Sequence, residues 1–249
     1  EGELSIARDI QLAMLPAGRV FDGLRTQLDT FAVLEPAKAV GGDFYTFFER
    51  EGNSLWFVVG DVSDKGIPAA LFMARSVTML EVAARLGGSP QIALLEAAKR
   101  LAEGNETCMF ATVLCGVIEE ETGMCALASA GHEPPVLLHA DGRAELLPVQ
   151  PGPPLGFEVA ERYHVWRGRL RAGDTLLVYT DGITEAFNGD DLAFGSERLL
   201  QGLDPALTAE GQCHRLLERV HAFAGAAPQS DDITVLAVKF LRSRAGEDD

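Results

Sequence analysis

Apolar residues along this chain occur in short runs that are separated by turn-forming residues, which is a pattern typical of β-strands. We predict extended segments at 26–37, 43–50, 54–62, 109–120, 124–132, 135–140, 144–149, 174–180 and 233–240. Two turn signals predict hairpins. Thr122-Gly123 lies between the segments 109–120 and 124–132, and Asp141-Gly142 lies between 135–140 and 144–149.

Helical spacing of apolar residues appears in five other segments, at 2–14, 68–86, 90–102, 196–203 and 208–224. The first of them carries Leu4, Ala7, Ile10 and Met14 on one face and ends before Pro16. Strands joined by hairpins, with helices inserted in pairs, favour an α+β fold of antiparallel sheets covered by helices. They do not fit a parallel sheet of alternating strands and helices.

Charge excludes two classes of partner. The 249 residues contain 37 Asp and Glu against 21 Lys and Arg, a formal net charge of −16. A chain this acidic lacks the basic stripe that nucleic-acid binding needs, and it disfavours adhesion to anionic lipid. The longest apolar stretch, Ala69 to Leu80, is interrupted by Arg75 and is too short to span a bilayer. We therefore expect neither a nucleic-acid nor a membrane partner.

The four cysteines show no metal-binding or disulfide spacing. Cys108, Cys115, Cys125 and Cys213 form no C-x-x-C pair. We interpret them as buried free thiols in a reducing cytosol and expect a cytoplasmic protein.

Two aspartates are placed to face each other across a hairpin. Asp43 opens the segment 43–50, Asp61 closes the segment 54–62, and each lies nine residues from Gly52 in the intervening turn. Residues that are equidistant from the turn of an antiparallel hairpin lie opposite each other. Two opposed carboxylates repel unless a cation lies between them, so this spacing indicates a metal site.

Two further aspartates belong to neighbouring strand ends if the last two strands pair. Asp181 follows the segment 174–180, and Asp231 precedes the segment 233–240. In an antiparallel pair these two ends share one edge of the sheet. A cluster of carboxylates without His or Cys suits Mg²⁺ or Mn²⁺ and disfavours zinc or copper. A single aspartate at a strand end is more often a solvated turn former, but four such residues flanked by glycines favour the metal site.

Six segments in order resemble one protein family. They are VGGDFY (40–45), VGDVSDKGIPAALFM (59–73), MFATVLCGV (109–117), SAGHEPPVLL (129–138), LRAGDTLLVYTDGITEA (170–186) and SDDITVLAVKF (230–240). Together they resemble the SpoIIE/RsbU-like branch of the metal-dependent protein phosphatases, the PPM or protein phosphatase 2C-like family. The resemblance runs from the first helix to the last strand.

The resemblance implies a four-layer αββα sandwich, in which two mostly antiparallel sheets pack face to face between outer helices. It also implies two Mn²⁺ or Mg²⁺ ions and hydrolysis of protein phosphoserine or phosphothreonine by attack of metal-bound water. On this basis Asp61 would bridge the two ions beside the backbone carbonyl of Val62. Asp181 and Asp231 would complete the first site, and Asp43 would bind directly or through water. Asp232 would have a lesser, supporting role.

Three positions depart from the family pattern. Asp64 replaces the second glycine of GDVSGKG, which adds an acid near the site. Thr46 stands where GGDFYD has its second acid, so no metal role is carried over to that position. The histidine that follows the bridging aspartate in eukaryotic members is missing from VSDK (62–65), so the general acid is not identified.

Partners and domain limits also follow from the resemblance. We expect the substrate to be a phosphorylated STAS-type anti-sigma-factor antagonist, and we expect an upstream sensor or receiver domain in the same chain. Residues 1–16 would be a helix that leads to that domain and offers a homodimer contact, 17–243 the phosphatase domain, and 244–249 a loose tail.

Two other functions compete with hydrolysis by a metal centre. A non-catalytic partner-switching module of the same fold stays open, although it has no need for four repelling aspartates. A phosphatase of the haloacid dehalogenase type, suggested by TDGIT, is rejected because position 179 is Tyr where that chemistry needs an aspartate.

Three basic residues near the predicted site have simpler interpretations. We interpret His132 as a hydrogen-bonded histidine at a strand end. Lys38 and Lys65 are equally compatible with contact to a phosphate and with solvation.

Overall fold

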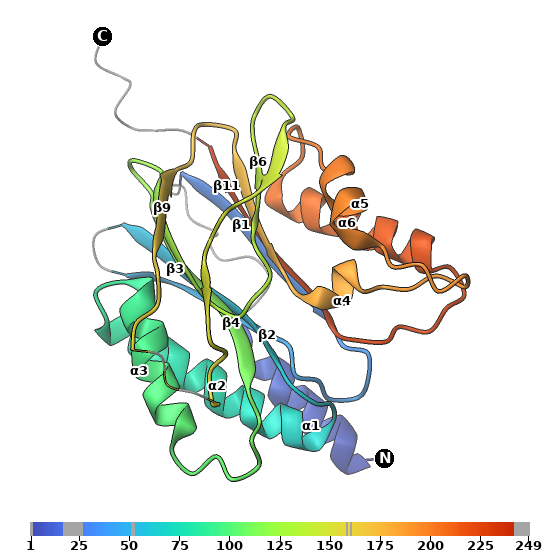
Figure 1. The fold of residues 1–249 in the computed structure, drawn as a ribbon. Coiled ribbons are helices and arrows are strands. Elements are labelled where there is room, and N and C mark those ends of the chain that lie inside the picture. The colour runs from blue at the N-terminus through green and yellow to red at the C-terminus, as the bar shows by residue number, and fades with distance from the viewer. Residues whose placement is uncertain (1, 17–26, 51–52, 158, 160, 242–249) are drawn as a thin grey trace.

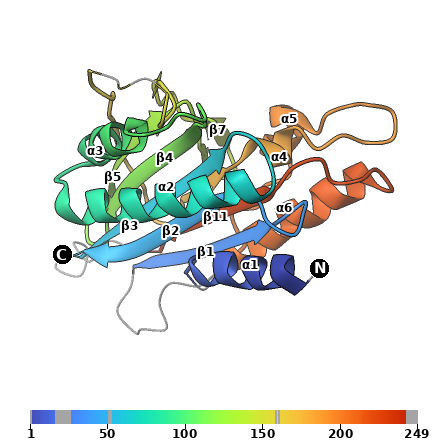
Figure 2. The ribbon, with the colours of Figure 1, turned by 90° about the horizontal axis from the view of Figure 1, so that it is seen from below.

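Two β-sheets lie face to face between helical layers in the computed structural model (Figures 1 and 2). The structure describes residues 2–16, 27–50, 53–157, 159 and 161–241. Gly52, the turn residue of the predicted hairpin, and the predicted tail 244–249 lie outside these residues. The predicted α+β sandwich is confirmed.

The first sheet has the order β1-β11-β10-β6-β7, and all its neighbours are antiparallel. Its strands are β1 (Leu28–Glu35), β6 (Val136–Leu138), β7 (Ala144–Leu146), β10 (Thr175–Tyr179) and β11 (Ile233–Phe240). Its outer face is covered by α4 (Asp181–Thr184), α5 (Gly195–Gln201) and α6 (Ala209–Ala224).

The second sheet has the order β2-β3-β4-β5-β8, and β9 also pairs with β5. Only the short β5–β8 pair is parallel among the described strand pairs. The strands are β2 (Phe44–Arg50), β3 (Ser54–Val62), β4 (Ala111–Glu119), β5 (Met124–Ala130), β8 (Pro151–Gly152) and β9 (Trp166–Arg169). Helices α2 (Ile67–Leu86) and α3 (Pro90–Ala102) pack on its outer face.

Strand β3 shows why the central strands contain continuous apolar runs. Leu55 and Phe57 point into the layer between the two sheets, while Trp56 and Val58 point to the layer under α2 and α3. All four side chains are buried. Because both faces of the strand are covered, alternation of polar and apolar residues disappears, as expected for a strand in the middle layers of a sandwich.

The helix α2 contains the apolar stretch that the sequence singled out, and it is longer than that stretch. Among the described helices it alone has the length and composition to cross a membrane. Its buried side chains, including Phe72, Met73 and Leu80, pack against the second sheet. This packing makes α2 a helix of the protein core.

Two sequence interpretations need correction. Cys108 is exposed, so only Cys115, Cys125 and Cys213 are buried free thiols. We predict no helix directly after the strand 174–180, but the short helix α4 begins there with Asp181. A single turn of helix has too few residues to show a helical period, which is why the pattern did not reveal it.

The N-terminal helix α1 (Gly2–Ala13) forms as predicted, but it buries none of its residues within the described chain. Leu4 is 40% exposed and Ile10 61%. Gln11 holds the helix to the loop before β2, because its amide nitrogen donates to the carbonyl of Gly41 and its amide oxygen accepts from the Gly41 N–H. The predicted apolar face is therefore largely open to solvent.

Candidate metal centre

The predicted hairpin pair lies at the end of the second sheet. The register of β2 and β3 pairs Phe44 with Gly60, which places Asp43 and Asp61 at the adjacent opposed positions. Asp43 lies directly before β2 and Asp61 is the second-last residue of β3, so both lie at one end of the sandwich. The equidistance argument therefore gave the correct register, although the turn itself lies outside the described residues.

The second pair lies at the matching end of the first sheet. Strands β10 and β11 are antiparallel neighbours, and Tyr179 pairs with Val235. Asp181 leaves β10 and Asp231 precedes β11 at this edge, so the structure brings them close enough for the charge of Asp231 to act on Asp181. The charges of Asp181 and Asp231 both raise the pKa of Asp61.

Asp43 joins the two sheets. Its Oδ2 atom accepts a hydrogen bond from the hydroxyl of Thr180 at 2.7 Å and another from the hydroxyl of Thr234 at 2.5 Å. Thr234 lies in β11 and Thr180 directly follows β10, both on the side of the first sheet, whereas Asp43 directly precedes β2 of the second sheet. All three residues are buried. Sequence reasoning missed these two threonines. The available signal was a threonine directly before Asp181 and another two residues after Asp232.

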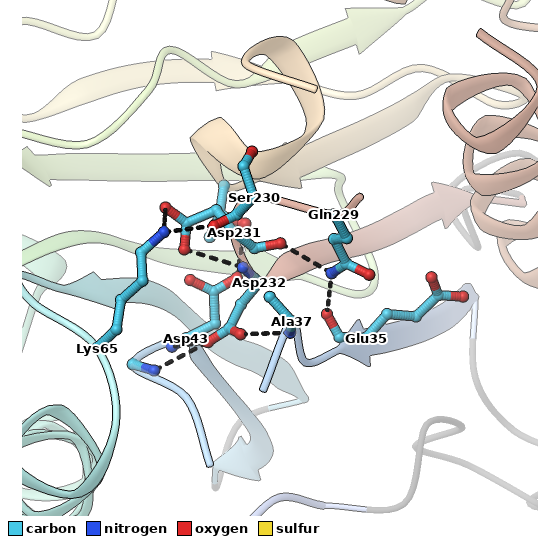
Figure 3. A network of polar contacts seen from close by, with 10 residues as sticks. Glu35, Ala37, Asp43, Lys65, Gln229, Ser230, Asp231 and Asp232 are labelled. Carbon is cyan, nitrogen blue, oxygen red and sulfur yellow. Dashed lines mark hydrogen bonds and ion pairs between the residues drawn. The ribbon is translucent and has the colours of Figure 1, made fainter. Parts of the chain in front are cut away.

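Asp232 positions the loop that carries Asp43. Its Oδ1 atom accepts from the backbone N–H of Ala37 at 2.8 Å, and its Oδ2 atom accepts from those of Gly42 at 2.9 Å and Asp43 at 3.3 Å (Figure 3). A Cβ atom on Gly41 would lie 1.9 Å from Oδ2 of Asp232, so this close approach requires glycine. These contacts give Asp232 a positioning task at the edge of the site.

Burial and mutual repulsion raise the pKa values of three carboxyls at the site. Desolvation and then the charge of Asp181 raise the pKa of Asp61 to about 7. Desolvation and then the charges of Glu185 and Asp231 raise the pKa of Asp181 to about 6. Burial, followed by the charge of Asp61, also raises the pKa of Asp43. A bound cation would relieve this repulsion.

A lysine supplies positive charge at this edge. The Nζ atom of Lys65 lies 2.9 Å from Oδ2 of Asp231 and donates to the carbonyl of Ser230 (Figure 3). Desolvation alone would lower the pKa of Lys65, but the hydrogen bond and charge of Asp231 and the charges of Asp232 and Asp61 raise it. Lys38 is exposed in the loop before β2.

Two further glutamates surround Asp181 and were not predicted. The charges of Glu185 and Glu133 both raise the pKa of Asp181. The pKa of Glu133 is itself raised by burial and by Glu185. Both follow motif residues, in TDGITE and AGHE, but nothing in their spacing shows that the two segments meet.

His132 has the role that its sequence context indicated. Its ring lies between the hydroxyl of Thr112 at 3.1 Å and the carbonyl of Tyr179 at 2.9 Å. Burial lowers its pKa to about 4, so the ring is neutral at physiological pH. The interpretation of a hydrogen-bonded histidine at a strand end is confirmed.

The carboxylate oxygens at this site are ligands that suit a hard divalent cation, but the side chains do not surround a common point in this structure. Within the described residues, no group of three or more His, Cys, Asp and Glu side chains is in position to hold a metal ion. Asp231 is turned to Lys65 and Asp43 to its two threonines. The oxygen-only chemistry and the unrelieved repulsion fit Mg²⁺ or Mn²⁺, which would require Asp231 to leave Lys65.

The two packed sheets and their flanking helices define a structural class, the PP2C-like fold. The profile of "Stage II sporulation protein E (SpoIIE)" matches residues 51–241. The chain therefore belongs to the SpoIIE family, which confirms the resemblance inferred from the six motifs.

Two curated relatives and one solved structure show how far the likeness extends. The chain is 30% identical over 264 residues to Protein IcfG of Synechocystis sp., covering 95% of this chain and 41% of that protein. It is 27% identical over 185 residues to the phosphoserine phosphatase RsbU of Bacillus subtilis, covering 74% and 54%. The chain thus spans about half the length of these relatives.

The solved structure is the SiaA-PP2C domain of Pseudomonas aeruginosa. It superposes with a TM-score of 0.82 at 21% identity and covers 96% of this chain and 95% of that one. At this identity the superposition supports the fold.

Proposed function

We propose that this chain hydrolyses phosphoserine or phosphothreonine in a protein substrate, with Mn²⁺ or Mg²⁺ as the cofactor. The observation that carries the proposal is the meeting of Asp43, Asp61, Asp181 and Asp231 at one end of two packed sheets. Burial and repulsion there disfavour the ionised forms of Asp43, Asp61 and Asp181. PP2C-type phosphatases are metal-dependent, and the donor set agrees with this property.

We assign the ligands as Asp61 for both ions, with the backbone carbonyl of Val62 beside it, and Asp43, Asp181 and Asp231 around them. When bound, two such ions would activate a water molecule and neutralise charge on the phosphoryl oxygens. The chain's own contribution is to orient the carboxylates. Thr180 and Thr234 fix one oxygen of Asp43, and Asp232 fixes the loop that carries it.

The substrate proposal rests on the relatives. RsbU carries the name phosphoserine phosphatase, and the sequence motifs of this chain resemble the same branch. We therefore propose a phosphorylated STAS-type antagonist as the substrate, with partner switching in the cytoplasm as the setting. An upstream sensor or receiver domain would supply the signal.

The exposed helix α1 is the proposed connection to that domain. Its apolar residues, including Ile10, remain open to solvent, while Gln11 ties it to Gly41, two residues before Asp43. A second copy of the helix would cover this apolar face, so we propose a homodimer contact here. Movement of the helix would then reach the site through Gly41.

The direct test is hydrolysis of a phosphoserine peptide by the purified chain with Mn²⁺, with Mg²⁺ and with excess chelator. Release of phosphate only with a divalent cation supports the proposal. Substitution Asp61→Asn should abolish turnover, while Asp9→Asn on the exposed face of α1 serves as a matched control. Substrate binding without turnover under every metal condition would instead favour the non-catalytic partner-switching module.

A further inference from the structure

Lys65 reaches across the site from a loop of unusual shape. It lies between β3 and α2, where Asp64 and Gly66 on either side of it have φ angles of +73° and +84°. A non-glycine residue at positive φ is uncommon, so the loop has a specific, tight conformation. This conformation places the ammonium group of Lys65 against Asp231, a residue 166 positions later in the chain.

Lys65 pairs with the carboxylate of Asp231, whereas two other carboxylates at the site have different partners. Asp43 is held by two threonine hydroxyls, and Asp232 is held by backbone N–H groups. The Oδ2 atom of Asp231 faces Lys65 at 2.9 Å, while its Oδ1 atom accepts the backbone N–H of Asp232. The lysine therefore neutralises the carboxylate that the proposed metal centre needs.

We propose that Lys65 is a displaceable internal cation, which pairs with Asp231 in the metal-free protein and competes with the divalent ion for that carboxylate. This inference rests on the proposed function, because it takes Asp231 as a metal ligand. Lys65 acts through Asp231 and is therefore a positioning residue.

Displacement is feasible because the ion pair is half exposed. The side chains of Lys65 and Asp231 retain 41% and 34% of their accessible surface. Pairs with this exposure are weak, since water and salt screen them. A lysine also has a flexible four-carbon stem, so its ammonium group can move into solvent when a divalent cation brings two charges to the same oxygens.

The experiment is calorimetric titration of Mn²⁺ into the metal-free chain, compared with the Lys65→Met variant. We expect Lys65→Met to lower the dissociation constant of Mn²⁺ by about threefold to fivefold, the range that a half-exposed ion pair allows. The gain should shrink at ~1 M KCl, where the Debye length is about 3 Å. Thermal melting with chelator should show a lower melting temperature for the variant, because the acids lose their counter-ion.

Two control variants separate the pair from general charge effects. Lys38→Met removes one positive charge from the neighbouring exposed loop and should change the dissociation constant less than Lys65→Met does. In an Asp231→Asn background, Lys65→Met should have no further effect, because the competing pair no longer exists.

Three outcomes would overturn the inference. Equal or weaker Mn²⁺ binding by Lys65→Met would show that the lysine is only a clamp between two loops, while the metal centre itself would stand. A gain of the same size in Lys38→Met would reduce the effect to net charge. Absence of Mn²⁺ binding in the wild type and in every variant would contradict the metal centre and the inference with it.

Discussion

At the scale of single residues, the fold brings Asp43, Asp61 and Asp181 to one end of the two sheets, where burial and repulsion disfavour their ionised forms. The opposition of Asp43 and Asp61 could be predicted from the sequence, because hairpin geometry depends only on the distance from a turn. The contacts of Asp43 with Thr180 and Thr234 could not, because they join two sheets whose stacking has no local signal. The same holds for Lys65 and Asp231.

The raised pKa of Asp61 gives the metal-free protein a specific pH dependence. In the folded chain this carboxyl has a pKa of about 7, above its value in the unfolded chain, so the folded state binds the extra proton between about pH 4 and 7. Stability must therefore fall as pH rises through this window. Asp181, with a pKa of about 6, adds a contribution of the same sign below pH 6.

His132 acts in the opposite direction, because its folded pKa of about 4 lies below its unfolded value. Its contribution rises with pH between about 4 and 6.5. The contributions of Asp61 and His132 to stability can be separated by comparing Asp61→Asn with the wild type by thermal melting in chelator, because both proteins retain His132.

The difference in melting temperature between Asp61→Asn and the wild type should grow in favour of the variant from pH 5 to pH 8. A constant difference across that range would show that Asp61 is not a buried acid.

Neutralising Asp43 should have opposite effects on stability and on function. An asparagine at this position can still accept from Thr180 and Thr234 through its amide oxygen, and it removes the repulsion with Asp61. We expect Asp43→Asn to raise the melting temperature of the metal-free chain and to weaken Mn²⁺ binding. Calorimetric titration and melting curves of one preparation check both parts. A lower melting temperature in chelator would mean that the carboxylate is already well compensated.

At the scale of elements, hairpins and amphipathic helices were the predictable parts. The pairs at Thr122-Gly123 and Asp141-Gly142 and the helices α2, α3 and α6 formed as predicted, because turn chemistry and periodicity act locally. The short elements α4, β8 and β9 were missed. They contain too few residues to show a period, and tertiary contacts define them.

The link between α1 and the site is the prediction at this scale. Gln11→Ala removes two hydrogen bonds to Gly41, so α1 should exchange its amide protons faster while the melting temperature of the core changes little. Asp9→Asn is the matched control, since Asp9 is exposed on the same helix and lies off its apolar face. Hydrogen exchange resolved over 2–13 distinguishes the two variants. Equal protection in both would show that Gln11 does not hold the helix.

At the scale of the whole molecule, the two packed sheets bring Asp43, Asp61, Asp181 and Asp231 to one end of the sandwich, in a chain of net charge −16. The ordered motifs already implied this sandwich, because a resemblance that spans the chain carries information on tertiary structure that periodicity lacks. The acids that the fold brings together repel one another, so an ion that binds only the folded state should stabilise the whole domain.

Metal ions should therefore raise the melting temperature. At a free Mn²⁺ concentration of ~100 times the dissociation constant, binding to one site adds about 2.7 kcal/mol to the free energy of unfolding. Differential scanning calorimetry with Mn²⁺ and with chelator measures this gain. An unchanged melting curve at saturating Mn²⁺ would mean that these acids bind no metal ion in the folded chain.

The number of Mn²⁺ ions bound per chain is the direct measure of the proposed two-ion centre. Equilibrium dialysis followed by elemental analysis, on the wild type and on Asp61→Asn, gives this number without reference to any substrate. We expect two ions in the wild type and a loss of both at the same free concentration in Asp61→Asn, because this carboxylate is the one assigned to both ions. No bound ion in the wild type, or equal binding in both proteins, would contradict the proposed two-ion centre.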